Sequence, residues 1–222
     1  MANTKSNSSA NSNNGSGPVY KLERTDAESG RTTLPTVWID NLIVFPGIVT
    51  SFEIERKDQI DAARAGQGDG NEILIATRIP VEEKKDLNGT LLKVGLAAKV
   101  LNILRLTNGH YQLMVEGARR VKRLRTVLSD GGCVSEIEEF VSEPGSPVRN
   151  AKAIRVLWAV FEDFLKYIPN PSEEVISELK QIDEPGWISD LLASNFLTGY
   201  DDRRDVFLEP DGLKRAKLLA DI

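Results

Sequence analysis

The sequence contains very few of the side chains from which metal sites and nucleophilic active sites are built. In 222 residues there is one cysteine, Cys133, and one histidine, His110. A structural zinc site takes four Cys or His ligands, so one chain cannot assemble it. A Ser-His-Asp triad would have to use His110, which directly follows an Asn-Gly turn and is better explained as a solvated strand residue. We therefore expect no catalytic residue, no metal and no cofactor in this chain.

Several other signatures are absent. No Gly-x-Ser-x-Gly elbow occurs, and the glycines of residues 66–70 are not followed by Gly-Lys-Ser/Thr, so we interpret this piece as a linker and not a phosphate-binding loop. No apolar run approaches the roughly 20 residues of a membrane helix. Residues 1–17 lack the charged start and apolar block of a secretory signal. With one cysteine and no possible intramolecular disulfide, these absences predict a cytoplasmic location and no membrane partner.

The charge of the chain argues against a general nucleic-acid binder. The net charge is -5 and the pI is near 5.1, whereas such binders carry a basic face. The exception is a basic cluster that runs from Arg119 to Arg125. It could contact the phosphates of a nucleic acid, or it could form the solvated face of an edge strand. Acidic residues 136–139 could pair with it across a sheet, so we favour the second interpretation.

The first segment of the chain, residues 1–33, is rich in Asn, Ser and Gly, with almost nothing apolar before Val19. Such a segment cannot bury enough surface to offset its ordering entropy. We predict a disordered tail and assign it no function.

Residues 34–142 carry the patterns of a β-rich domain. The segment of residues 44–48 contains Pro46 and Gly47, which turn the chain between strand-like runs at residues 36–43 and 49–55. Further strands are predicted at residues 72–78, 91–106, 110–116 and 134–140, with a bend in the second of these, an Asn-Gly hairpin turn at residues 107–109 and a short helix at residues 57–65. Five or six strands with one inserted helix favour a closed or half-closed barrel.

After residues 143–147 the hydrophobic period changes to that of helices. Spacings of three and four residues place one apolar stripe on the first helix: Ile154, Leu157, Trp158, Phe161, Leu165 and Ile168. Ser172 could cap a second helix with Val175, Ile176, Leu179 and Ile182 on its buried face. A third follows Pro185 with Trp187 on its inner side, Asp201 could cap a fourth, and a fifth opens near Asp211. Residues 143–222 are therefore predicted to form a helical bundle, and the whole chain an α+β fold.

A series of short motifs then resembles the N-terminal domain of the Lon family of ATP-dependent proteases. In order they are Leu34-Pro35, Phe45-Pro46-Gly47, Val94-Gly95, Val115-Glu116-Gly117, Arg119-Arg120-Val121, Ile182-Asp183-Glu184-Pro185-Gly186 and Asp190-Leu191-Leu192-Ala193. The resemblance implies a PUA-like β-barrel joined to a helical bundle. It also implies a non-catalytic domain that captures unfolded or degron-bearing proteins and helps to assemble a homo-oligomer, a hexamer in a full Lon protease.

The ATPase and peptidase motifs of that family do not occur in this sequence. The chain is therefore expected to be a fragment of a longer protease, because helical spacing continues from Leu213 to Ile222 with no capping Gly or Pro. The alternatives are a stand-alone Lon-like substrate-binding adaptor and a PUA-like nucleic-acid binder that uses Arg119 to Arg125.

The predicted substrate-binding residues are Phe45, Pro46, Ile48 and Phe52, around the turn. Unfolded proteins share exposed hydrophobic groups and little else, so an exposed apolar patch is the physical means of binding them. The alternative for Phe45 and Phe52 is that both are core residues.

Overall fold

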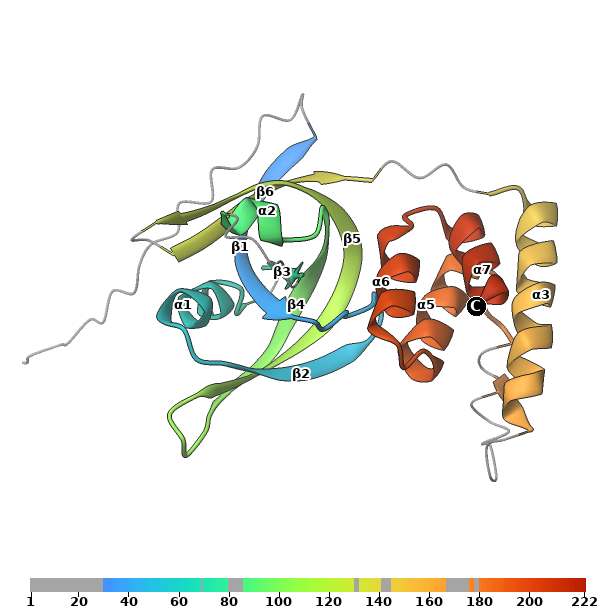
Figure 1. Cartoon of the computed structure of the whole chain (residues 1–222), viewed down its shortest axis with the longest axis horizontal. Helices are drawn as coiled ribbons and strands as arrows, with labels where there is room; N and C mark the ends of the chain where they lie inside the picture. The colour runs from blue at the N-terminus through green and yellow to red at the C-terminus, as the bar shows by residue number, and fades with distance from the viewer. Residues whose placement is uncertain are drawn as a thin grey trace, which may run out of the picture.

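The computed structural model describes residues 30–68, 70–79, 86–129, 132–140, 145–166, 176–177 and 180–222. In chain order the elements are β1 (Arg31–Asp40), β2 (Val49–Ile54), α1 (Lys57–Ala65), β3 (Ile73–Arg78), α2 (Leu87–Thr90), β4 (Val94–Arg105), β5 (Tyr111–Ser129), β6 (Gly132–Glu139), α3 (Pro147–Leu165), α5 (Pro185–Phe196), α6 (Tyr200–Leu208) and α7 (Gly212–Asp221). The mixed α+β composition agrees with the prediction. Figure 1 places the strands in one half of the molecule and helices α3, α5, α6 and α7 in the other.

The strands close into a ring. The sheet order is β2-β5-β4-β3-β1-β6, and an additional pairing joins β5 to β6. Five strands, β1, β3, β4, β5 and β6, therefore form a closed circuit, and β2 adds to the first half of β5 outside that circuit. This arrangement confirms the sequence-based expectation of a barrel.

The long strand β5 makes the closure possible. Its first half pairs with β2 and its second half with β6, while its other edge pairs with β4 from Tyr111 to Lys122. Leu113 and Val115 are buried and Met114 between them is exposed, which is the period of two that the sequence predicts. At Gly117 a Cβ atom would lie 2.3 Å from the carbonyl oxygen of Phe45, so only glycine lets the strand approach the loop after β1 this closely.

Several elements differ from the sequence-based predictions. β1 begins at Arg31, inside the predicted tail, because residues 31–35 pair with β6, about 100 residues away; the rest of that tail, residues 1–29, lies outside the described residues. β5 continues to Ser129, beyond residue 116 where the predicted strand ends, and its pairing with β4 shifts register between Gly117 and Arg119. The one-turn helix α2 was not predicted; Asp86 caps it by accepting a hydrogen bond from the amide of Gly89.

The helical half follows the predicted period where the structure describes it. Leu157 and Phe161 of α3 are buried, as their spacing requires. At α5 the carboxylate of Glu184 accepts hydrogen bonds from the first amides of the helix, and Pro185 occupies the first turn. The cap predicted at Asp201 is wrong, since Gly199 is the N-cap of α6 and Asp201 lies in its first turn. The predicted cap Ser172 and most of the second helix lie outside the described residues.

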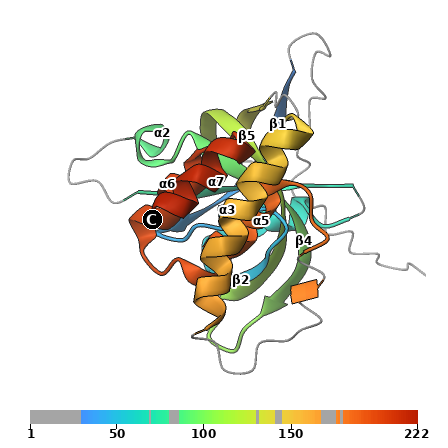
Figure 2. The same cartoon turned by 90° about the vertical axis from the view of Figure 1, so that its right-hand side faces the viewer.

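One hydrophobic core runs through both halves. It includes Phe45 of the loop, Leu113 of β5, Leu157 of α3 and Phe207 of α6. A second, smaller cluster fills the other part of the barrel around Leu74 and Ile137. Figure 2 shows α3, α5, α6 and α7 beside one another, and Figure 1 places them on the side of the molecule opposite α1. The loop between β1 and β2, which sequence analysis singled out, lies where barrel and helices share this core.

Candidate functional site

The loop of residues 41–48 carries three of the four predicted binding residues and fixes one of them in the core. Phe45 has no exposed surface. Its ring meets the ring of Phe207 edge to face, with centroids 6.0 Å apart, and the guanidinium groups of Arg120 and Arg203 lie 5.9 and 5.3 Å from its centroid. These contacts anchor the loop between barrel and bundle, which is the core role that the sequence left open for Phe45.

The next two residues form the turn at the surface. Gly47 has a φ of +73° and donates a hydrogen bond of 2.8 Å to the carbonyl oxygen of Gly117. A Cβ atom on Gly47 would lie 3.1 Å from Nε1 of Trp187, so the indole packs directly against the turn. Trp187 is 39% exposed, which corrects the prediction that it faces inward. Pro46 and Trp187 line a depression of about 280 Å³ between barrel and helices.

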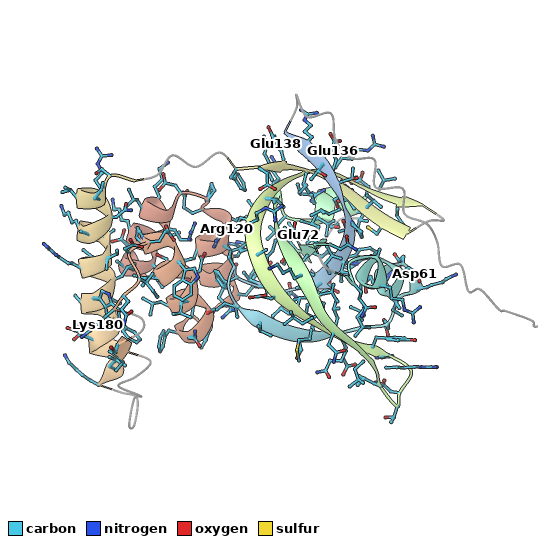
Figure 3. All side chains as sticks on the ribbon, turned by 180° about the vertical axis from the view of Figure 1, so that it is seen from behind. Asp61, Glu72, Arg120, Glu136, Glu138 and Lys180 are labelled. Carbon is cyan, nitrogen blue, oxygen red and sulfur yellow. The ribbon has the colours of Figure 1, made fainter. Side chains whose placement is uncertain are left out.

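Below this depression lies a buried ionic cluster, the junction cluster, made of Arg120, Asp190 and Arg215. Arg120 donates two hydrogen bonds of 2.6 Å to the carboxylate of Asp190 and a third to the carbonyl oxygen of Phe207. Nε of Arg215 lies 3.0 Å from the same carboxylate. Burial and the neighbouring Arg120 lower the pKa of Arg215. Figure 3 shows Arg120 at the boundary between the barrel and the helices.

A second cavity, the β1–β2 pocket, has a volume of about 400 Å³ and lies between β1 and β2. Its apolar lining comes from both strands and the loop between them: Trp38, Ile39, Leu42, Phe52 and Ile54. Its polar lining is mostly charged: Asp40, Glu53, Glu55, Arg56, Arg78, His110 and Gln59.

The charges around the β1–β2 pocket are arranged in pairs at the surface. Arg78 donates to both carboxylate oxygens of Asp40, at 2.5 and 2.6 Å. The two ring nitrogens of His110 lie 3.2 Å from Glu53 and 3.4 Å from Glu55. His110 is half-exposed and directly precedes β5, so it is a solvent-accessible residue, as predicted.

The structure separates the four predicted site residues. Phe45 is in the core, Pro46 lines the depression beside Trp187, and Phe52 lines the β1–β2 pocket. Ile48 is half-buried between them and packs against the core. Binding by these residues stays a prediction. Sequence reasoning missed Trp187 as a surface residue because its position on the apolar stripe of α5 gives the same signal as a buried one.

The basic cluster is largely neutralised within the fold. Arg119 binds Glu72 and Glu139, and these contacts raise its pKa, while Lys122 lies 3.0 Å from Glu138. Pairing with acidic residues across the sheet is therefore confirmed. The solvated face that we expected is wrong for Arg120 and Arg123, which are buried. Arg123 donates to the carbonyl oxygens of Leu91 and Leu92, and burial lowers its pKa.

The remaining titratable candidates show no reactive arrangement in the described part of the chain. Cys133 is buried, and burial raises the pKa of its thiol to about 12, so the thiol is protonated near neutral pH. No group of three or more His, Cys, Asp or Glu side chains among the described residues is placed to hold a metal ion. No described helix is long and apolar enough to cross a membrane.

Comparison with known proteins identifies the family to which this fold belongs. The family model of the ATP-dependent protease La (Lon) substrate-binding domain matches residues 33–222. The chain belongs to this family. The match covers every described helix and strand apart from the first two residues of β1.

Full-length relatives and solved domains agree with this assignment. The chain is 26% identical over 194 residues to the Lon protease of Brevibacillus choshinensis and 27% identical over 187 residues to that of Xanthomonas oryzae pv. oryzae, covering 87% and 84% of this chain. It spans only 25% and 22% of those two relatives. The solved N-terminal domain of the Mycobacterium avium complex Lon protease has the same fold, with a TM-score of 0.64, 19% identity, and coverage of 86% of this chain and 97% of that one.

Proposed function

We propose that this chain captures segments of unfolded or degron-bearing proteins and delivers them to a Lon-type ATP-dependent protease. The observation that carries the proposal is the family match over residues 33–222, which includes both the barrel and the helices. The chain spans about a quarter of the Lon proteases that it matches, so the ATPase and peptidase modules would belong to the rest of such a protein. In that context the domain would also help to assemble the oligomer, a hexamer in a full Lon protease.

The binding surface in this proposal is the apolar rim around the β1–β2 loop. Pro46, Ile48 and Phe52 retain exposed area, and Phe45 serves as the buried anchor that holds the loop in place. Trp187 and Val49, which are 39% and 55% exposed, extend this rim on either side of the turn. Exposed aromatic and aliphatic groups bind the apolar side chains that unfolded proteins present.

The finer description of the fold belongs to the same proposal. Residues 34–142 would be a PUA-like barrel and residues 143–222 a helical bundle, acting as one unit because their cores are continuous. The chain would work in the cytoplasm, where damaged proteins arise. A stand-alone adaptor would use the same surface. The nucleic-acid alternative receives little support, because Arg119, Arg120 and Lys122 already pair with carboxylates of the chain.

The experiment compares two charge-introducing variants for capture of a chemically denatured protein. Val49→Glu places a charge on the proposed rim, whereas Val127→Glu places one at the distant end of β5, at a valine that is 41% exposed. We expect Val49→Glu to weaken capture about tenfold, equivalent to about 1.4 kcal/mol, and Val127→Glu to leave it unchanged. Both variants should keep the circular dichroism spectrum of the parent chain.

Equal capture by both variants and the parent chain would contradict the proposed surface. Binding of RNA with a steep dependence on salt would favour the nucleic-acid alternative instead.

A further inference from the structure

Strand β2 has a free edge among the described residues. It pairs with β5 on one side, and the other side carries no backbone hydrogen bond to any described strand. The amide of Gly117 donates a hydrogen bond of 3.1 Å to the carbonyl oxygen of Ile48. Ile48 is therefore one of the residues whose peptide groups face β5. In an antiparallel pair, alternate residues direct their peptide groups to opposite edges. The peptide groups that bond to β5 are therefore those of Thr50, Phe52 and Ile54. The peptide groups that point to the free edge are those of Val49, Ser51 and Glu53.

The facing edge of β1 is also open in part. Residues 31–35 of β1 pair with β6, and residues 36–40 pair with β3 on the other side. The second half of β1 thus has no strand partner on its β6 side within the described chain. One carbonyl there, that of Trp38, accepts a hydrogen bond of 2.8 Å from the side chain of Gln59. Unpaired strand edges are templates for pairing with another chain.

The β1–β2 pocket lies between these two edges, so the free peptide groups border a cavity of about 400 Å³. Phe52 and Ile54 point their side chains toward the barrel and line its apolar part. Side chains alternate across a strand, so those of Val49, Ser51 and Glu53 lie on the outer face. A strand added beside β2 would place alternate side chains against the apolar lining and the others beside Glu53.

The carboxylates at the border of the β1–β2 pocket favour cationic residues at the outward positions of an added strand. Glu53 and Glu55 are mostly exposed, and His110 between them is the group that contacts both. The cations Arg78 and Arg56 are already held by Asp40 and Asp58. A peptide with basic residues on its outer face would meet two carboxylates with no competing arginine.

We propose that the free edge of β2 binds an extended peptide segment as an added strand, with apolar side chains directed into the β1–β2 pocket and basic side chains beside Glu53 and Glu55. The inference rests on the proposed function and deepens it, because it names the backbone as the shared feature recognised in unfolded proteins. Every extended segment offers the same peptide groups, so strand addition suits many sequences. β2 has six residues, about 20 Å of strand, which matches a segment of about six residues.

The test uses a seven-residue peptide of alternating Val and Lys with blocked ends and a fluorescent label. Two N-methylated forms of this peptide are compared. One carries methyl groups on the backbone amides of the Val residues, and the other carries them on the backbone amides of the Lys residues. An added strand turns only one phase of its amides toward β2, so one form should lose binding by about tenfold or more and the other should bind like the parent peptide. Fluorescence anisotropy measures both.

Two protein variants test the same edge. Ser51→Pro removes the outward N–H of Ser51 and keeps the backbone bonds to β5, since proline is tolerated on an edge whose N–H faces solvent. It also removes the side-chain hydrogen bond of 3.4 Å that Gln112 of β5 donates to the Ser51 hydroxyl. Glu53→Lys reverses one charge at the border of the β1–β2 pocket. We expect each to weaken binding of the Val-Lys peptide about tenfold. Glu53→Lys should also improve binding of a matched peptide in which Glu replaces each Lys.

The outcomes separate this inference from the proposed function. Equal binding of both N-methylated forms would overturn strand addition whatever the variants do, while capture of denatured protein through the apolar rim could still hold. Phase-dependent peptide binding without capture of denatured protein would support the free edge and contradict the proposed function.

Discussion

The junction cluster and the β1–β2 pocket differ in the environment of their polar groups, which are buried and paired in the first and exposed to solvent in the second. At the junction, Asp190 is 2% exposed and its carboxylate is fully engaged by Arg120 and Arg215. At the pocket, the charged pairs lie in solvent, and the peptide groups of β2 that point away from β5 have no backbone partner among the described residues. A buried polar group without a partner destabilises the fold, whereas an exposed one is hydrated and can exchange water for a ligand. The junction therefore stabilises the fold, and the pocket is the region where we propose that a peptide binds.

The strongest test of this comparison removes the shared carboxylate of the junction. Asp190→Ala removes the carboxylate that two buried arginines share and leaves Arg120 without its bidentate partner, so we expect the free energy of unfolding to fall by roughly 3–5 kcal/mol. Urea denaturation followed by tryptophan fluorescence measures it. The matched control is Asp201→Ala, which removes the exposed partner of Arg204 and should cost less than about 1 kcal/mol. Equal losses would show that the junction is no more than another surface ion pair.

An intermediate effect is expected where β5 passes the loop. Gly117→Ala would place its Cβ atom 2.3 Å from the carbonyl oxygen of Phe45, which is backbone and cannot rotate away. We expect a loss of roughly 1–3 kcal/mol of stability from this overpacking. Gly199→Ala, which would meet only the flexible side chain of Asp202, should cost less than about 1 kcal/mol. If Gly117→Ala has the same melting temperature as the parent chain, the close approach of strand and loop is contradicted.

The smallest effect is expected at the pocket. Arg78→Ala breaks the exposed pair with Asp40, and we expect a loss of stability below about 1 kcal/mol that disappears in high salt. The same denaturation experiment at low and high salt measures it. A loss as large as that of Asp190→Ala would mean that the pocket also holds the fold, and the contrast between the two regions would fail.

Prediction from sequence succeeded where the signal is local. The period of two places Leu113 and Val115 inward and Met114 outward, and spacings of three and four bury Leu157 and Phe161 of α3. It failed where a distant partner decides. In the sequence, Arg120 and Arg123 resemble the other members of a basic run. No local feature shows that Arg120 is buried against Asp190, 70 residues away, or that Arg123 is buried against the carbonyl groups before β4.

The candidate site divides in the same way. Pro46 and Gly47 identify the turn in the sequence, because only such residues make that backbone readily. The burial of Phe45 and the exposure of Trp187 depend on how α5 and α6 dock against the loop, and the same apolar residues could face either way.

The sequence by itself determined the order of strands and helices, the position of the turn and the scarcity of catalytic side chains, since each of these depends on neighbours within a few residues. Only the tertiary structure decided that five strands close while one edge of β2 has no strand partner in the described parts of the chain, and which charges are buried. Those outcomes depend on pairings between residues that are far apart in the chain, where geometry and desolvation select one partner among many of the same chemical type.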